Sequence, residues 1–239
     1  MKNTYIKVEN EKQIDTLIKY CRKTGYASVD FETNGREFHH PLFYITTVSI
    51  SFQPGMSYVI PLGHKDSIFK DRWVYIFKKI GKAIFEDVNI TKVAHNFKFE
   101  MLCARVYGIK FRGRLFDNML AKYLLKEERP NDLKSIVAQF IPYYAHYDLK
   151  GQPGGKATRK RIVEFWSNVE LNELCKYNAL DTDLTLRLMM FFEYLLIKNN
   201  FYKLFRNLMM MATRVLHDSE WSGMPIDIDY IDSLVVSYK

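Results

Sequence analysis

The sequence of 239 residues has only three cysteines, Cys21, Cys103 and Cys175, and they lie far apart. This odd number at wide spacing provides neither a disulfide framework nor the paired cysteines of a zinc site. No run of 18 apolar residues occurs, and residues 1–10 lack the apolar core of a signal peptide. These absences argue against export and against a membrane-spanning segment, and they are consistent with a reducing compartment.

The chain is instead rich in apolar and basic residues. It is 48% hydrophobic and 15% aromatic, which is enough for a buried core and argues against global disorder. Its 35 Lys and Arg residues outnumber its 27 Asp and Glu residues, so the formal net charge is +8. Such a charge favours an anionic partner such as nucleic acid, although many soluble proteins are basic without one.

The hydrophobic pattern predicts strands first and then alternating helices and strands. The expected strands are 3–9, 26–31, 44–52, 57–61, 91–95 and 111–116. The expected helices are 11–24, 73–84, 96–107, 117–125, one capped by Asn131 or Asp132 that runs to 140, 170–198 and 204–221. The order of these elements indicates an α/β fold, with a mixed sheet flanked by helices. Within this sheet we expect strands 26–31, 44–52 and 57–61 to form an antiparallel meander.

The run from Tyr26 to Phe31, with the Glu32 that follows it, carries two acids at alternate positions. Asp30 and Glu32 are expected to share one face, while Val29 and Phe31 point into a core. Two carboxylates this close repel each other, and a bound cation is the usual remedy. The alternative is an exposed strand face with two solvated acids.

A second candidate group lies on the long helix at 170–198. Tyr177 and Asp181 are four residues apart and therefore share a face of a helix that is otherwise rich in apolar residues. A phenol and an acid on such a helix need partners, although a satisfied pair on the helix surface is an alternative. We expect Asp183, two residues later, to face solvent.

Three segments together resemble the exonuclease motifs of the DEDD superfamily, tyrosine branch. They are Asp30-Phe-Glu32-Thr33, Asn96-Phe-Lys98-Phe99-Glu100 and Tyr177-Asn-Ala-Leu-Asp181. Stretches 108–113, 115–125 and 132–136 resemble the 3′-5′ proofreading domain of family A, polymerase I-like DNA polymerases. The resemblance covers about residues 25–195. It implies an RNase H-like fold and removal of 3′-terminal nucleotides, as 5′-monophosphates, from a single-stranded, frayed or mismatched DNA 3′ end.

The resemblance also implies a catalytic set and its cofactors. Asp30, Glu32, Glu100 and Asp181 are expected to bind two divalent ions, Mg²⁺ with Mn²⁺ as a substitute, while Tyr177 orients the attacking water. Glu100 stands where the family has aspartate, and its longer side chain suggests a weaker second metal site. Asp117 is a possible substitute ligand, although the matching family segment suggests a structural acid there.

Further residues are candidates for nucleic-acid binding. The candidates are Thr33, Asn34, Asn96, Lys98, Phe99 and Tyr147, with Phe165 as a further residue able to stack on a base. Core packing is the alternative for each aromatic residue, and a solvated helix surface is the alternative for Lys98. Residues 145–161 are rich in glycine and basic residues, which fits either a loop at the substrate or a solvated insertion.

The organisation of the chain follows from the same resemblance. We expect an exonuclease domain at 1–198, and at 199–239 a helical linker that begins a polymerase region, because residues 220–227 resemble the link to a polymerase thumb. The polymerase region would be fused in cis or form a separate chain, and a self-standing nuclease is the alternative. The protein is expected to be monomeric and intracellular, in a bacterium, a phage-infected cell or an organelle. An RNA exonuclease of the ribonuclease D kind and a catalytically decayed binding module are the rival functions.

Overall fold

The structure, a computed structural model, describes residues 3–147 and 169–238. Phe165 and most of the basic segment 145–161 lie outside these residues. The strands are β1 (Thr4–Lys7), β2 (Tyr26–Thr33), β3 (Ile45–Gln53), β4 (Met56–Pro61), β5 (Thr91–Ala94) and β6 (Leu115–Asp117). The α-helices are α1 (Glu11–Thr24), α2 (Trp73–Ile80), α3 (Lys98–Val106), α4 (Asn118–Leu125), α5 (Leu133–Phe140), α7 (Leu171–Lys198), α8 (Tyr202–Leu204), α9 (Met210–Ser222) and α10 (Ile228–Ser237).

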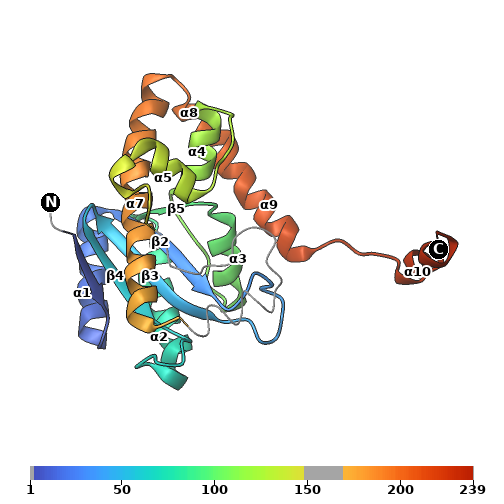
Figure 1. The fold of residues 1–239 in the computed structure, drawn as a ribbon, viewed down its shortest axis with the longest axis horizontal. Helices are drawn as coiled ribbons and strands as arrows, with labels where there is room; N and C mark the ends of the chain where they lie inside the picture. The colour runs from blue at the N-terminus through green and yellow to red at the C-terminus, as the bar shows by residue number, and fades with distance from the viewer. Residues whose placement is uncertain (1–2, 148–168, 239) are drawn as a thin grey trace.

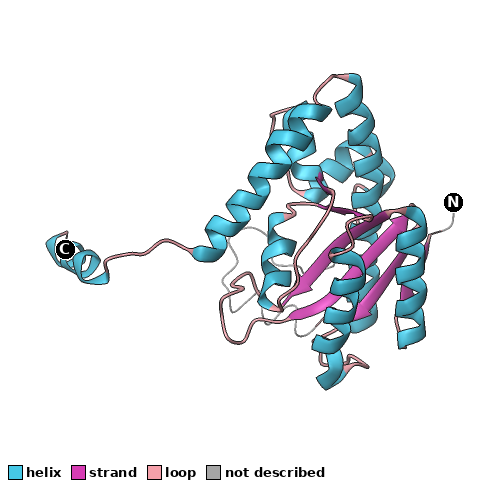
Figure 2. Ribbon diagram, turned by 180° about the vertical axis from the view of Figure 1, so that it is seen from behind, coloured by secondary structure: helices cyan, strands magenta, loops and turns pink. Residues whose placement is uncertain are grey.

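The strands form one mixed sheet in the order β1-β4-β3-β2-β5-β6, flanked by helices (Figures 1 and 2). The pairs β2-β3 and β3-β4 are antiparallel, whereas β1-β4, β2-β5 and β5-β6 are parallel. The predicted α/β class and the antiparallel meander are both confirmed. The acidic strand β2 lies between an antiparallel and a parallel neighbour, near the middle of the sheet.

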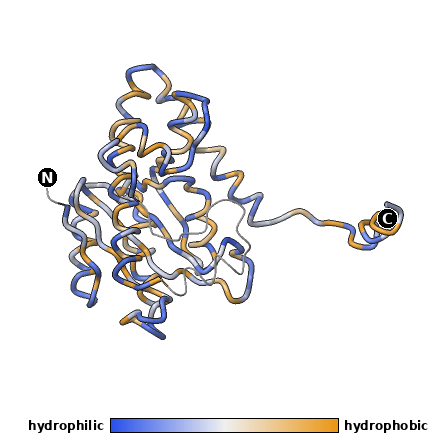
Figure 3. The backbone as a smooth tube through the Cα atoms, in the orientation of Figure 1, coloured by the Kyte–Doolittle hydropathy of each residue, from blue (hydrophilic) through white to orange (hydrophobic). Residues whose placement is uncertain are grey.

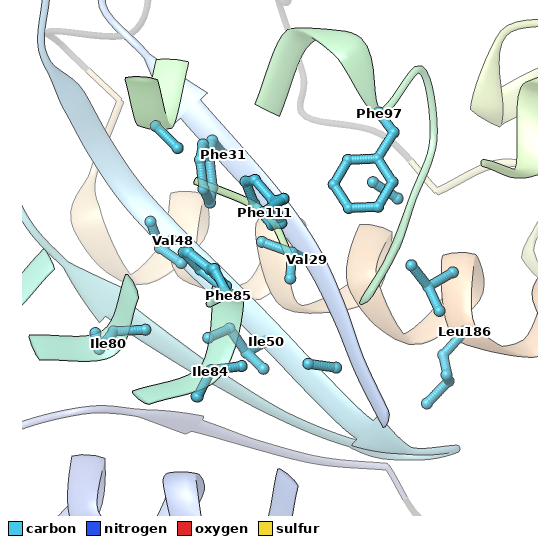
Figure 4. Packing of buried hydrophobic residues seen from close by; sticks show 14 of the residues in the cluster. Val29, Phe31, Val48, Ile50, Ile80, Ile84, Phe85, Phe97, Phe111 and Leu186 are labelled. Carbon is cyan, nitrogen blue, oxygen red and sulfur yellow. The ribbon is translucent and has the colours of Figure 1, made fainter. Parts of the chain in front are cut away.

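The two faces of β2 meet different surroundings. Val29 and Phe31 point to the face where β3 supplies Val48 and Ile50, and the segment at 80–85 packs onto these residues (Figure 4). Helix α7 packs across β2, β3 and β4 on the other face. Because side chains alternate along a strand, burial of Val29 and Phe31 turns Asp30 and Glu32 toward α7.

Asp117 organises the start of two helices. Its carboxylate accepts the backbone N–H groups of Asn96 and Phe97 at 3.1 and 2.8 Å, ahead of α3. It also caps α4 by accepting the N–H of Met119 at 2.9 Å. These bonds make Asp117 a structural acid, as the family segment suggests. Helix α3 begins at Lys98 and not at Asn96, because Asn96 is in the left-handed region with φ 62°.

The strand expected at 111–116 is shorter than predicted and occupies only Leu115–Asp117. Gly113, just before it, has φ 72°, and a Cβ there would come within 2.6 Å of the carbonyl oxygen of Val88. A left-handed glycine in this close approach interrupts the extended backbone. Pairing with β5 therefore begins only at Leu115.

The C-terminal part is helical, as expected for 204–221, and continues from α8 through Phe205–Met209 into α9. Helix α10 lies away from the body, at the end of an extended segment (Figure 1). Apolar residues occur along α10 although it is remote from the core (Figure 3). Among the described residues, no helix is both long and apolar enough to cross a membrane.

Candidate active site

Three acids from two distant segments converge between the sheet and α7. Asp30 and Glu32 come from β2, and Asp181 comes from α7. One carboxylate oxygen from each residue lies within 4.8 Å of the others. The structure thus brings together the acids that the sequence placed on one strand face and on one helix face.

A buried polar seam sets the position of α7 on the sheet. Ser49 and Thr182 share a hydrogen bond of 2.6 Å, and Ser57 donates to the backbone carbonyl of Ala179 at 2.9 Å. Their small side chains let the helix approach the sheet closely, and each buried hydroxyl must find its partner for the contact to be stable. We infer that this seam fixes the rotation of α7 that directs Asp181 at β2.

Asn178 extends this row of polar contacts to the acids. It was not identified from the sequence. Its amide donates to Oδ2 of Asp30 at 2.5 Å, while its own carbonyl oxygen accepts from the hydroxyl of Thr47 at 3.1 Å. Asn178 precedes Asp181 by three residues, so the helical spacing could have placed it on the same face. It fixes the orientation of the Asp30 carboxylate.

Glu100, the fourth predicted acid, reaches the site from α3. It is 3% exposed, and its Oε2 makes no hydrogen bond to any residue that the structure describes. It lies outside the group formed by Asp30, Glu32 and Asp181. Burial, followed by repulsion from Asp30, raises the pKa of Glu100. A buried carboxylate oxygen without a hydrogen bond is costly, and it marks a place where a cation or an ordered water fits.

The acids on β2 are electrostatically strained in the same way. Burial is the main cause that raises the pKa of Asp30, and the charge of Asp181 adds to it. For Glu32, burial and then the charges of Asp30 and Asp181 raise the pKa, while the charge of Lys134 opposes them. Carboxylates that lie this close together favour the binding of a cation, which offsets their repulsion.

These residues fit a divalent cation. Every donor in the set is a carboxylate oxygen, and one oxygen of Glu100 is buried without a hydrogen bond. Hard cations such as Mg²⁺ and Mn²⁺ prefer oxygen ligands, whereas zinc sites draw mainly on nitrogen and sulfur. The arrangement therefore suits the chemistry of a carboxylate-bound metal centre.

Tyr177 lies one turn before Asp181 on α7. Its ring stacks beside that of Tyr147 with 6.3 Å between the centroids, and Nζ of Lys134 lies 5.5 Å from the Tyr177 centroid. Burial, and then the charges of Asp181 and Glu32, raise the pKa of Tyr177. Its hydroxyl therefore stays protonated at neutral pH, so it can orient a bound water but cannot serve as a free base.

The other predicted contact residues lie in varied surroundings. Thr33 donates to the carbonyl of Gly35 at 2.6 Å, and Asn34 donates to the carbonyl of Leu42 at 2.6 Å. Phe99 is half-buried and packs against the core, and Lys98 pairs with Glu220 of α9. Among the aromatic residues predicted to stack on a base, Tyr147 lies next to Tyr177. The roles of all these residues in substrate binding stay predictions.

The expectation that Asp183 faces solvent is wrong. Asp183 is fully buried, and its carboxylate accepts the N–H of Gly55 at 2.7 Å and that of Arg187 Nε at 3.0 Å. The hydroxyl of Tyr5 and Nη2 of Arg187 each donate to the other oxygen of the Asp183 carboxylate at 3.2 Å. The β3–β4 turn and β1 reach α7 at this position, so Asp183 anchors the helix to the sheet.

A family model described as 3′-5′ exonuclease matches residues 5–197 of this chain. Among curated proteins, DNA polymerase I of Borreliella burgdorferi is 26% identical over 227 residues, which cover 95% of this chain and 24% of that protein. The DNA polymerase of Escherichia phage T5 is 27% identical over 237 residues, covering 94% of this chain and 27% of that protein. The chain spans about a quarter of the length of these relatives.

Solved structures with a similar fold include Brucella melitensis NrnC, with a TM-score of 0.63 at 18% identity, covering 95% of this chain and 98% of NrnC. The POL domain of Pol1 from M. smegmatis, in complex with DNA primer-template and dNTP, has a TM-score of 0.71 at 15% identity, covering 98% of this chain and 35% of that chain. At these identities the likeness concerns the fold, and it agrees with the RNase H-like class expected from the sequence.

Proposed function

This chain belongs to the 3′-5′ exonuclease family of DNA polymerase I-like proteins, and we propose that it removes 3′-terminal nucleotides from single-stranded or frayed DNA as 5′-monophosphates. One observation carries this proposal, namely the convergence of oxygens from Asp30, Glu32 and Asp181 within 4.8 Å, one turn from Tyr177. Oxygens grouped in this way suit hydrolysis of a phosphodiester with the help of divalent cations.

Each residue of the site has a distinct part in the proposal. Asp30, Glu32 and Asp181 would hold two divalent cations together with Glu100, Mg²⁺ with Mn²⁺ as a substitute. Bound there, the cations would supply Lewis acidity for the scissile phosphate and acidity for a water. The protonated hydroxyl of Tyr177 would orient that water.

Glu100 is the departure from the family pattern that bears on this chemistry. Burial, and after it the charge of Asp30, raises the pKa of Glu100. Its side chain has one more methylene than aspartate, so its oxygens stand further from the backbone of α3. A cation with strict geometric demands would therefore bind less tightly at Glu100 than at an aspartate.

Binding of an unpaired 3′ end is supported by charge and by the aromatic pair. The net charge of +8 favours a polyanion. Tyr147, stacked beside Tyr177, offers a ring for an unpaired base, and stacking of this kind accepts any base. Thr33, Asn34, Asn96, Lys98 and Phe99 complete the proposed contact set.

DNA is the proposed substrate because the curated relatives are DNA polymerases. We accordingly propose that residues 1–198 form the exonuclease domain of a polymerase of family A, acting as a monomeric unit in proofreading. Residues 199–239 would lead to a polymerase region, fused or separate. The fold neighbours keep an RNA exonuclease as the rival function, since a structure of NrnC is described as bound to pGG.

A decayed binding module is the other rival, and the energetics of the site disfavour it. Acids whose pKa values are raised by desolvation and mutual repulsion, here Asp30, Glu32 and Glu100, reduce the stability of the metal-free fold at neutral pH. A module that only bound nucleic acid would gain stability by losing them. Their presence together favours a working metal site.

The substrate proposal is tested with DNA and RNA oligonucleotides of one sequence, each labelled at the 5′ end, and with a primer-template carrying a 3′ mismatch. The expected result is faster shortening of DNA than of RNA, and of the mismatched primer than of a fully paired one. Faster shortening of RNA would replace DNA proofreading by the RNA function, since the 2′-hydroxyl is the group that distinguishes the two.

A further inference from the structure

Lys134 occupies a position that neither the helix nor the core requires. It is the second residue of α5, directly after the cap formed by Asp132, whose side chain accepts the N–H of Ser135 at 3.0 Å. A positive charge in the first turn lies at the positive end of the helix dipole, where it is unfavourable. The buried residues of α5 are Ile136 and Val137, whereas Lys134 is only half-buried. The dipole and the buried face of α5 therefore do not account for a basic residue here.

The side chain of Lys134 extends toward the acidic site. Helix α5 packs on α7, and Nζ of Lys134 lies 5.5 Å from the ring centroid of Tyr177. Its charge also acts on Glu32, where it opposes the effects of burial and of the neighbouring acids. Lys134 is therefore a cation at the rim of the acidic cluster, on the side where Tyr177 lies.

The proposed reaction needs a positive group at this place. Its substrate is a phosphodiester, an anion that must approach carboxylates of the same sign. A lysine ammonium offers three hydrogen-bond donors on a flexible stem, and it serves proteins as a point charge for phosphate oxygens. In the proposed function the scissile phosphate must lie close to both Tyr177 and the acids, which is the region that Lys134 reaches.

We propose that Lys134 binds a non-bridging oxygen of the 3′-terminal phosphodiester and so positions the scissile phosphate beside Tyr177 and the acids. The contact rests on the proposed function, because it names the substrate group that this same site holds. It makes Lys134 a specificity residue for a charged terminal linkage. It also supplies positive charge near a site in which Glu100 departs from the family aspartate.

The test compares two DNA single strands in a chelating buffer, where no cleavage intervenes. One strand has phosphodiesters throughout, and the other has an uncharged methylphosphonate at its 3′-terminal linkage. Binding is measured by fluorescence anisotropy for the wild-type protein, Lys134→Ala and Lys134→Arg. Lys176→Ala is the matched control, because Lys176 is exposed on α7 and adjoins Tyr177 in the chain.

For the all-phosphate strand, Lys134→Ala is expected to weaken binding about 10-fold or more, since a charge-assisted hydrogen bond contributes about 1.5–3 kcal/mol. For the methylphosphonate strand, Lys134→Ala and the wild type should bind alike. Lys134→Arg should keep part of the affinity, and Lys176→Ala should lower binding of both strands equally and slightly. In a further control strand the methylphosphonate replaces the second linkage from the 3′ end and the terminal linkage keeps its charge. On this strand Lys134→Ala should again bind more weakly than the wild type.

The contact would be overturned if Lys134→Ala lost the same affinity for both strands, or lost no more affinity than Lys176→Ala. The melting temperature of each variant shows whether a loss of affinity comes from misfolding. Failure of the proposed function has a different signature, in which the wild type shortens neither DNA nor RNA with Mg²⁺ or Mn²⁺ whatever the binding data show. If the wild type shortens DNA but Lys134→Ala loses the same affinity for both strands, only the contact of Lys134 is rejected and the proposed function stands.

Discussion

Asn178 on α7 donates a hydrogen bond to Asp30 on β2 over 2.5 Å, and so ties the helix that carries Tyr177 and Asp181 to the strand that carries the first two acids. The same amide accepts the hydroxyl of Thr47 on β3. Because both contacts are made within the protein, the Asp30 carboxylate is oriented without help from a bound ion. The geometry of the site thus depends on a residue outside the predicted catalytic set.

Asn178→Ala should lower both stability and metal affinity. The substitution leaves the Thr47 hydroxyl and the Asp30 carboxylate without their buried partner, which should reduce the free energy of unfolding by about 1–3 kcal/mol. Denaturant unfolding and Mn²⁺ titration by calorimetry measure the two effects. Asn172→Ala, at the exposed start of α7, is the control; it removes only a solvent-exposed bond from Lys7 and should change stability by less than about 0.5 kcal/mol.

Asp181 and Asp183 should respond in opposite ways to the same change. Asp183→Asn weakens the ion pair with Arg187 and the bond from Gly55, and it should cost about 2–3 kcal/mol of unfolding free energy. Asp181→Asn removes a charge that repels Asp30 and Glu32, so in a chelator it should leave the fold as stable or more stable. Only Asp181→Asn should abolish activity while preserving the fold, and loss of stability in both variants would contradict the assignment.

The metal-free protein should lose stability as the pH rises. Burial, followed by repulsion between the acids, raises the pKa of Asp30 and of Glu32 above ordinary values near about 4. Above that pH the folded protein therefore retains protons that the unfolded chain has released. The free energy of unfolding then falls by about 1.4 kcal/mol per pH unit for each retained proton.

Denaturant unfolding in a chelator, at pH values from about 4.5 to 8, measures this slope. Asp30→Asn should flatten it, and saturating Mn²⁺ should restore stability at neutral pH, because the cation binds the folded state alone. A slope that Asp30→Asn leaves unchanged would show that the acids are paired by other groups.

Glu100→Gln should separate the acid's effect on stability from its effect on metal binding. The amide keeps the shape of the side chain and removes a buried charge that repels Asp30. In a chelator, the variant should be as stable as the wild type or more stable, while the increase in melting temperature caused by Mn²⁺ should become smaller. An unchanged Mn²⁺ effect would place Glu100 outside the metal site.

Local periodicity predicted the parts of the site that lie on one element. Alternation along β2 placed Asp30 and Glu32 on one face, because burial of Val29 and Phe31 leaves no other choice. The helical repeat likewise placed Tyr177 and Asp181 together. Neither pattern carries information about the element that lies opposite.

The residues that were misplaced or missed have partners far away in the sequence. Asp183 meets Gly55 and Tyr5, which are 128 and 178 residues distant. Helix α7 is buried around most of its circumference near this point, so its weak amphipathic pattern could not distinguish a solvent face from a sheet face. Lys134 depends in the same way on the packing of α5 against α7, which no short pattern encodes.

The surroundings of Lys98 show a third limit. Glu220 of α9 pairs with it from 122 residues away, a contact that no short pattern reveals, and the approach of Lys98 to a phosphate stays a prediction. The strand at 111–116 was overestimated for a related reason, since the close approach of Gly113 to Val88 is a tertiary contact. Tertiary contacts, rather than intrinsic propensity, decided these details.

The most direct test of the function follows a single-stranded DNA labelled at its 5′ end during incubation with the protein. With Mg²⁺ or Mn²⁺, the wild type should produce a ladder of products that shorten stepwise from the 3′ end and release 5′-mononucleotides. A chelator or Asp30→Ala should leave the strand intact. An intact strand with the folded wild type in both metals, or shortening that survives Asp30→Ala, would contradict catalysis at this cluster of acids.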